Sequence, residues 1–220
     1  MAKRPTPGEV KTRMCPPLSP GEAAELYAAM LDDTLATSAE AATRAGAALW
    51  LMGHPPEGLD ALAARCPPGT EVRAQSGPDL GARMEHAVVS AAEAGFGRVL
   101  LRGSDSPALP AEALIEGLAA LADCDLAVGP DADGGYAWIA LRRPQPGLFA
   151  HPMSTARVLE DTLAGAAAAG LRSRRLAPCF DLDTASDLAR LEAARRRGEA
   201  GACPRTLALL DARDHWCHLA

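Results

Sequence analysis

Lysine is nearly absent from this 220-residue sequence: of its 22 basic residues only Lys3 and Lys11 are lysines, and the others are arginines. No stretch of 18 or more apolar residues occurs, which excludes a membrane-spanning helix. The basic start has no apolar core after it, so it does not predict a secretory signal. The net charge of −6 disfavours general binding to nucleic acid or to an anionic membrane. We therefore expect a cytoplasmic protein with neither nucleic acid nor membrane as partner.

Paired cysteines are absent as well. The six cysteines are widely scattered and form no C-x-x-C pair, which predicts mostly reduced thiols and no disulfide framework. Near the end of the chain, Cys203, His215, Cys217 and His218 offer the nitrogen and sulfur ligands that zinc takes. Their spacing matches no standard zinc site, so a C-terminal tail is the favoured interpretation.

The length and the element pattern predict one α/β domain. A chain of 220 residues suits one substantial core, and we expect a single domain over 1–220 with residues 203–220 as a C-terminal tail. Helices are predicted from the capping signals at Ser19 and Asp79. Strands and helices alternate, which implies a mostly parallel sheet in three layers. Strands are expected at 47–52, 71–75, 99–101, 126–128 and 136–141, and helices from 19, at 79–94, 110–121, 154–169 and 184–197, then a short helix and tail.

Both lysines lie in one loop rich in proline and glycine, from Ala2 to Arg13. Lys3, Lys11 and Arg13 can converge there on phosphate oxygens, because cations in a rigid loop neutralise the charge that develops in phosphoryl and nucleotidyl transfer. A disordered basic N-terminus is an equally good interpretation of the pattern alone.

Three acidic motifs follow at predicted loop positions. Asp105 in GSDSP comes directly after a strand and can bind Mg²⁺ or Mn²⁺, or it caps a turn. In GPDADGGY, Asp133 can accept hydrogen bonds from sugar hydroxyls beside two glycines, or the segment is an ordinary hairpin turn. In DLDT, Asp181 and Asp183 lie on the same side of an extended segment, and capping of the next helix explains one acid but not both. A second metal ligand is the functional interpretation.

In this order the motifs resemble a known bacterial family, DUF2064, whose members are similar to GT-A nucleotide-diphospho-sugar transferases. The resemblance covers nearly the whole chain and rests on six segments. These are AKRPTPGEVKTR (2–13), QSGPDLGARM (75–84), GSDSP (103–107), GPDADGGY (129–136), STARV (154–158) and DLDTASDL (181–188).

The resemblance implies a Rossmann-like GT-A three-layer αβα sandwich and a set of site roles. Lys11 and Arg13 would hold phosphates and, with Asp105, carry catalysis, and Asp105 and Asp183 would ligate Mg²⁺ or Mn²⁺. The implied nucleotide-binding residues are Lys3, Lys11, Arg13, Gln75, Gly81 and Ser104. The implied sugar- or acceptor-binding residues are Asp133, Gly134, Gly135, Tyr136 and Ser154.

The sequence departs from the family pattern at two places. Members usually carry an apolar strand directly before the AK motif, and here almost nothing precedes it, so the first strand is expected to be truncated. The neighbouring strand would then keep backbone N–H and C=O groups without hydrogen-bond partners. Either the start codon is misassigned or the protein is a compromised copy. Met153 also stands where Trp is common, which would alter the acceptor pocket.

Three functions follow as hypotheses. The first is metal-dependent glycosyl transfer from a nucleotide sugar to a small-molecule acceptor, which the resemblance favours. The second is nucleotidyl transfer from an NTP to a phosphorylated small molecule with release of pyrophosphate, which the basic loop favours. The third is a catalytically degenerate nucleotide-binding protein. No motif identifies the base, the acceptor or the oligomeric state.

Overall fold

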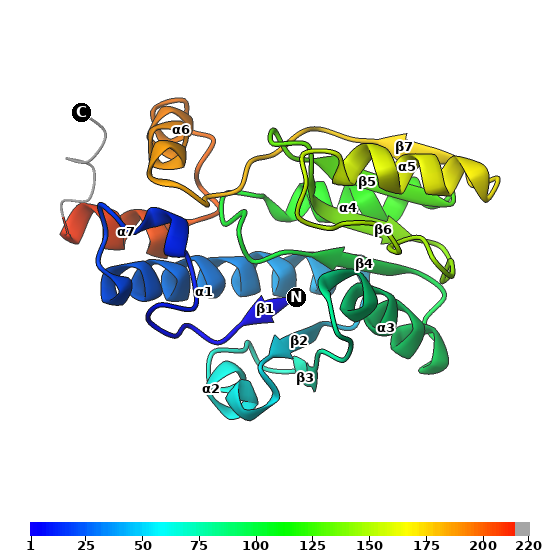
Figure 1. Ribbon diagram of the computed structural model, residues 1–220, viewed down its shortest axis with the longest axis horizontal. Coiled ribbons are helices and arrows are strands. Elements are labelled where there is room, and N and C mark those ends of the chain that lie inside the picture. The colour runs from blue at the N-terminus through cyan, green and yellow to red at the C-terminus, as the bar shows by residue number, and fades with distance from the viewer. Residues whose placement is uncertain (214–220) are drawn as a thin grey trace.

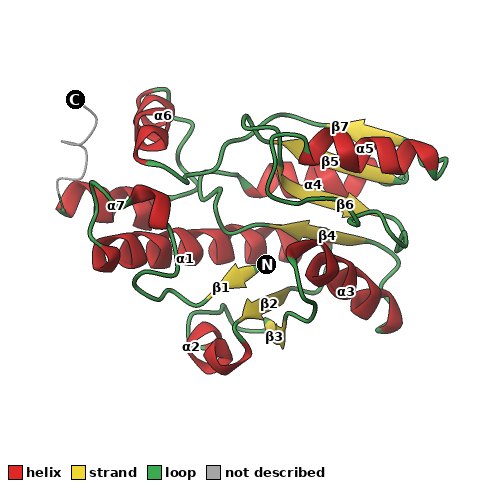
Figure 2. Ribbon diagram, viewed as in Figure 1, coloured by secondary structure: helices red, strands yellow, loops and turns green. Residues whose placement is uncertain are grey.

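The computed structural model describes residues 1–213, which form two sheets with helices on both sides (Figures 1 and 2). The strands are β1 (Ala2–Lys3), β2 (Trp50–His54), β3 (Glu71–Ala74), β4 (Val99–Arg102), β5 (Leu126–Pro130), β6 (Tyr136–Leu141) and β7 (Ser173–Arg175). The α-helices are α1 (Pro20–Ala45), α2 (Leu59–Ala63), α3 (Leu80–Glu93), α4 (Ala111–Ala120), α5 (Val158–Ala168), α6 (Ala185–Arg196) and α7 (Pro204–Ala212). The α/β fold class is thereby confirmed.

The predicted helix starts are confirmed in detail. Ser19 caps α1 in a complete capping box with Glu22, and Pro20 occupies the first turn. Asp79 caps α3 by accepting a hydrogen bond from the amide of Ala82. Each cap satisfies backbone donors that an open helix end leaves without partners, so the chain enters both helices at a fixed residue.

The strands pair as two sheets, with orders β1-β2-β3 and β4-β6-β5-β7. All pairings are parallel except the two that involve β6. The connection from β5 to β6 is too short for a crossover helix, so these strands form a hairpin and must be antiparallel. β1 has two residues and lies between β2 and β4 (Figure 2).

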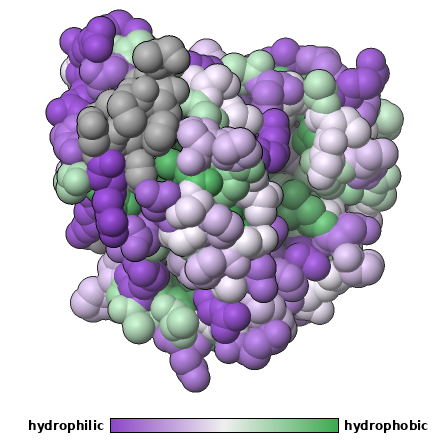
Figure 3. All heavy atoms as spheres, turned by 60° about the vertical axis from the view of Figure 1, so that its left-hand side comes forward, coloured by the Kyte–Doolittle hydropathy of each residue, from purple (hydrophilic) through white to green (hydrophobic). Residues whose placement is uncertain are grey.

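Alternating side chains of the second sheet supply two hydrophobic layers. Leu126, Val128 and Ile139 face α3 and α5, whereas Ala127 and Trp138 face α4 and the end of α1. This period of two is what a strand buried on both faces requires, and it produces the expected three-layer arrangement. On the face shown in Figure 3 hydrophilic residues predominate, in keeping with only three large hydrophobic side chains, Leu80, Val89 and Phe96, being exposed among the described residues.

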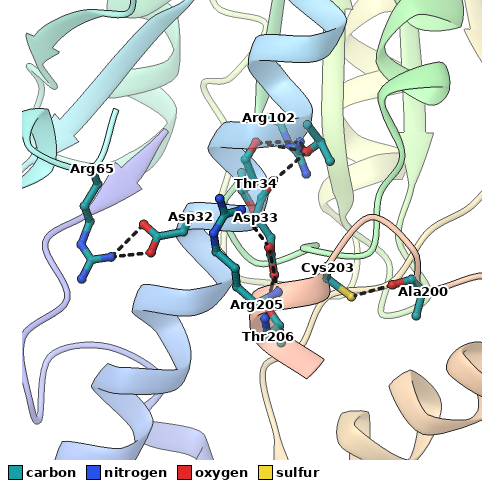
Figure 4. A network of polar contacts seen from close by, with 10 residues as sticks. Asp32, Asp33, Thr34, Arg65, Arg102, Ala200, Cys203, Arg205 and Thr206 are labelled. Atoms are coloured by element: carbon teal, nitrogen blue, oxygen red, sulfur yellow. Dashed lines mark hydrogen bonds and ion pairs between the residues drawn. The ribbon is translucent and has the colours of Figure 1, made fainter. Parts of the chain in front are cut away.

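The last described helix is held by a buried acid of α1 (Figure 4). Asp33 is fully buried and accepts hydrogen bonds from the amides of Arg205 and Thr206 and from the Thr206 hydroxyl. α7 lies within the segment 203–220 that the sequence predicts to be a tail, and Cys203 at its start is buried. The chain up to residue 213 is therefore part of the folded domain. His215, Cys217 and His218 lie outside the described residues.

Within residues 1–213, no helix combines the length and apolar character needed to cross a bilayer. The five cysteines in this range are free, in agreement with the predicted absence of a disulfide framework.

Candidate functional site

The loop after β1 presents Lys11 from an unusual backbone conformation. Lys11 has φ 48° and ψ 34°, in the left-handed region that non-glycine residues seldom occupy. Buried Val10 and Met14 anchor the loop on either side of it. The side chain of Lys11 is only 3% exposed, so the strained backbone holds an ammonium group inside the protein.

Two distant carboxylates meet this ammonium group. Lys11 Nζ donates to Asp105 Oδ1 and to Asp183 Oδ1, the latter at 2.7 Å. The two acid-bearing segments are joined directly, since the amide of Leu182 donates to the carbonyl of Asp105 at 2.8 Å. Three segments far apart in the sequence are thus brought together at the carboxyl ends of β1 and β4, where open α/β sheets bind ligands.

The start of α6 leaves the carboxylate of Asp183 available. Thr184 is the N-cap and forms a capping box with Asp187, whose Oδ2 accepts from the amides of Asp183 and Thr184. Capping is therefore done by Thr184 and Asp187. The Asp183 side chain instead faces Lys11 and, at 3.7 Å, the guanidinium group of Arg13.

The lysine side chain of this cluster is buried, whereas the two acid side chains are partly exposed to solvent. The side chains of Asp105 and Asp183 are 39% and 35% exposed, against 3% for Lys11. Burial by itself lowers the pKa of Lys11, but the attraction and hydrogen bonds of Asp105 and Asp183 outweigh it, so the pKa is raised and the ammonium stays charged. Lys11 contacts only the Oδ1 atom of each acid. The Oδ2 atom of Asp105 has no hydrogen-bond partner within residues 1–213.

Asp181 belongs to the same region but is held differently from Asp183. Its Oδ1 accepts from the hydroxyl of Ser106, and burial raises the pKa of Asp181 to about 7. Burial also raises the pKa of Asp131, at the end of β5, to about 6. Both acids therefore hold a proton more tightly than an exposed aspartate does.

Sequence reasoning missed Tyr27 of α1. Its hydroxyl is hydrogen-bonded to the Ser104 hydroxyl at 2.7 Å and accepts from the amide of Lys3 at 3.0 Å. Tyr27 thereby ties the end of β1 to the turn that carries Asp105. Tyr27 lies on the buried, mostly apolar side of α1. The only sequence signal that could have pointed to it is a single tyrosine among apolar residues.

Three residues expected to bind nucleotide face inward instead. The Ser104 hydroxyl is buried on Tyr27, and the Gln75 side chain donates to the carbonyls of Ala2 and Met52. A Cβ atom on Gly81 would lie 2.3 Å from the carbonyl oxygen of Phe149, so this glycine allows close packing of α3. These are the contacts that the three residues make in the structure, and their part in nucleotide binding stays a prediction. Lys3 is exposed beside the loop.

The turn between β5 and β6 is shaped by Gly134. This residue has φ 93°, its carbonyl accepts from the amide of Leu159, and an added Cβ atom would lie 2.0 Å from the carbonyl oxygen of Ala156. Asp133 accepts from the amide of Gly135 at 3.3 Å and remains exposed. Burial raises the pKa of Tyr136 to about 12, and Ser154 is exposed. The turn is fixed by backbone constraints, with Asp133 and Ser154 at the surface.

A family model matches this chain and shows the family to which it belongs. A family model described as an uncharacterized protein conserved in bacteria (DUF2064) matches residues 34–155, more than half of the chain. The chain belongs to the DUF2064 family. The match includes Asp105, whereas Lys11 and Asp183 lie outside it.

Solved structures extend the comparison. The DUF2064 protein described here superposes with a TM-score of 0.86 on the crystal structure of a candidate nucleotide-diphospho-sugar transferase from Desulfovibrio desulfuricans G20. The two are 32% identical, and the match covers 97% of this chain and 92% of the other. A CMP:2-keto-3-deoxy-manno-octonic acid synthetase complexed with CTP matches with 14% identity over 77% of this chain and 88% of the other. Its TM-score is 0.46. No protein with a curated description matches the chain.

Proposed function

We propose that this DUF2064 protein is a transferase acting on a nucleotide-activated substrate, whose phosphates are held at the Lys11–Asp105–Asp183 cluster. The observation that carries the proposal is a fully charged lysine buried between two carboxylates that remain open to solvent. Complete burial of an ion pair costs desolvation free energy. The two carboxylates here stay partly exposed, so a ligand can still reach their oxygens. The 32% identity to a candidate nucleotide-diphospho-sugar transferase over almost the whole chain supports the same conclusion.

The donor set fits a hard divalent cation. Mg²⁺ is commonly held by one or two carboxylates, with waters and substrate phosphates completing its shell. Asp105 and Asp183 each place their Oδ1 atom against the Lys11 ammonium group, and the Oδ2 atom of Asp183 lies 3.7 Å from Arg13. Asp105 and Asp183 are the ligands we assign to Mg²⁺ or Mn²⁺. No group of three or more His, Cys, Asp or Glu side chains that could hold a metal ion occurs within residues 1–213. Such an ion, when bound, neutralises the negative charge of a leaving diphosphate.

Glycosyl transfer is the reaction we favour. The acceptor hydroxyl oxygen attacks the anomeric carbon of the sugar, and the bond from that carbon to the phosphate oxygen breaks. The diphosphate leaves with the bonding electrons, and the hydroxyl proton passes to solvent water. Lys11 and Arg13 stabilise the negative charge on the leaving group by electrostatic attraction. Asp133 and Ser154, both exposed near the β5–β6 turn, are the side chains we assign to sugar or acceptor binding.

One observation favours nucleotidyl transfer as the second candidate. Arg13 is 69% exposed beside Asp183, and Lys3 is exposed at the end of β1, so two further cations are open to solvent and can meet a longer phosphate chain. In that reaction a phosphate oxygen of the second substrate attacks the α-phosphorus of an NTP, and pyrophosphate leaves with the electrons of the broken bond.

The released product distinguishes the two reactions. The purified protein is incubated with Mg²⁺ or Mn²⁺, with a panel of nucleotide sugars and acceptors, and separately with NTPs and phosphorylated small molecules. Release of nucleoside diphosphate supports glycosyl transfer, and release of pyrophosphate supports nucleotidyl transfer. Failure to bind any nucleotide in the presence of either metal would contradict both.

A further inference from the structure

A buried arginine lies directly behind the turn that carries Asp105. Arg102 is the last residue of β4 and is only 8% exposed. Its guanidinium group makes four hydrogen bonds, all to uncharged oxygens, and no carboxylate of residues 1–213 forms an ion pair with it. Burial lowers the pKa of Arg102 to about 10, so the group stays charged at neutral pH. A buried cation without an acid partner costs desolvation free energy, which an apolar side chain of similar size would not.

One end of the guanidinium group is held by α1. Nη1 donates to the hydroxyls of Thr37 at 2.9 Å and Ser38 at 3.2 Å, and to the carbonyl of Thr34 at 3.3 Å. Figure 4 shows Arg102 beside Thr34. The three residues of α1 are three and four positions apart, so they share one face of the helix. Thr37 and Ser38 are weak helix formers, and here their hydroxyls supply acceptors for Arg102.

The other end of the guanidinium group holds Ser106. Nη2 donates to the carbonyl of Ser106 at 2.9 Å. The Ser106 hydroxyl in turn donates to Asp181, two residues before Asp183. Ser106 therefore connects the segments that carry both proposed metal ligands, and Arg102 attaches this connection to α1.

Both neighbours of Asp105 are thus attached to the same helix. Ser104 is hydrogen-bonded to Tyr27 of α1, and Ser106 is held on α1 by Arg102. Tyr27 lies seven residues before the first of the residues that meet Arg102, and positions seven apart lie on one face of a helix. A single face of α1 therefore fixes the backbone on each side of Asp105.

We propose that Arg102 is a positioning residue for the cation site of Asp105 and Asp183. By holding Ser106 on α1, it keeps the two carboxylates close enough to meet one ion. The inference rests on the proposed function for the ligand and on these hydrogen bonds for the geometry. Arginine suits this role because its planar fork donates to two partners in fixed directions, whereas methionine fills similar space without donating.

The first test compares Arg102→Met with Arg142→Met. Arg142 follows β6 at the end of the sheet remote from Arg102 and also donates to backbone carbonyls, those of Leu121 and Ala122. Electron paramagnetic resonance titration with Mn²⁺ and a nucleoside diphosphate measures the affinity of each. Arg102→Met should bind Mn²⁺ about fivefold more weakly than the wild type, because groups behind a metal ligand orient it, and Arg142→Met should bind like the wild type. Wild-type affinity in a folded Arg102→Met protein would overturn the inference.

A milder pair of variants serves if Arg102→Met does not fold. Thr37→Val removes a hydroxyl that accepts from Arg102 and keeps the shape of the side chain. Thr34→Val is the matched control, because the buried Thr34 hydroxyl has no hydrogen-bond partner within residues 1–213. Thr37→Val should weaken Mn²⁺ binding about threefold, and Thr34→Val should leave it unchanged. Equal affinity in these two variants would contradict the role of Arg102.

Hydrogen exchange separates this inference from the proposed function. The Leu182 amide donates to the Asp105 carbonyl, and its exchange can be followed without metal or nucleotide. At equal free energy of unfolding, this amide should exchange faster in Arg102→Met than in Arg142→Met. Failure of the wild type to bind Mn²⁺ would contradict the proposed function, and the exchange rates would still test the positioning role. Equal exchange rates at Leu182 in both variants would refute that role.

Discussion

Two ionic clusters, around Asp33 and around Lys11, join distant parts of this protein. They differ in whether their carboxylate groups are buried or exposed to solvent. Around Asp33, both carboxylate oxygens accept hydrogen bonds from the start of α7, and the side chain has no exposed surface (Figure 4). Around Lys11, the ammonium is buried but both acids remain more than a third exposed. The first arrangement secures α7 to α1. The second leaves carboxylate oxygens facing solvent, where a ligand can reach them.

The comparison predicts that substitutions in the open cluster affect activity, and substitutions in the closed cluster affect stability. The largest effect is expected for Asp105→Asn, which keeps the shape of the side chain but removes a metal ligand. Metal-dependent turnover should fall about 10³-fold or more, because charge stabilisation of the leaving group is lost. The measurement is product release at saturating Mg²⁺. A matched control is Glu112→Gln, which removes an exposed acid paired with Arg44 and should leave turnover unchanged.

An Asp105→Asn variant with wild-type turnover would remove Asp105 from the site. The melting temperature serves as the second readout: Asp183 still pairs with Lys11, so we expect a smaller loss of stability than for Asp33→Ala. Loss of both turnover and folding would make Asp105 a structural residue like Asp33.

Asp33→Ala should produce the next largest effect, on stability. It leaves two amides and one hydroxyl at the start of α7 without their acceptor, at a cost of about 3 kcal/mol in the free energy of unfolding. Urea denaturation measures this change. The adjacent Asp32→Ala is the control, because Asp32 forms a partly exposed ion pair with Arg65 and should cost less than about 1 kcal/mol. Equal costs for the two variants would contradict the contrast between closed and open clusters.

A smaller effect is expected for Asp181→Asn, in the pH dependence of stability measured without metal. Burial raises the pKa of Asp181 from 3.8 to about 7, so the folded state holds this proton more tightly than the unfolded chain. The stabilisation is complete below the unfolded pKa and is lost as the pH rises through about 7. Asparagine does not titrate, so the variant should lose less stability than the wild type between pH 4 and 7. Parallel stability curves over that interval would contradict the raised pKa.

Much of the fold could be predicted from the sequence because its signals are local. The caps at Ser19 and Asp79 act within one helical turn, and the apolar runs that became β5 and β6 are buried. α2 and β7 were not predicted. β7 (Ser173–Arg175) is exposed at all three residues, so it has no hydrophobic pattern and forms only because β5 offers a free edge.

The candidate site was predictable in its charged residues and not in its neutral ones. Lys11, Asp105 and Asp183 each follow a strand or precede a helix, and such loops converge at one edge of a parallel sheet. The contacts of Ser104 and Gln75 depend on the direction of their side chains, and those of Gly81 depend on how closely the Phe149 backbone approaches. Those features depend on the packing of Tyr27, β1 and Phe149, which no local pattern encodes.

Binding of Mn²⁺ tests the central claim most directly. Electron paramagnetic resonance titration, with a nucleoside diphosphate present, measures free Mn²⁺ for the wild type, Asp105→Asn and Asp183→Asn, with Asp32→Asn as control. We predict one site in the wild type and the control, and affinity at least about tenfold weaker in each of the other two variants, because each loses one of the two carboxylate ligands. Wild-type affinity in both Asp105→Asn and Asp183→Asn would show that the cation and the nucleotide meet elsewhere.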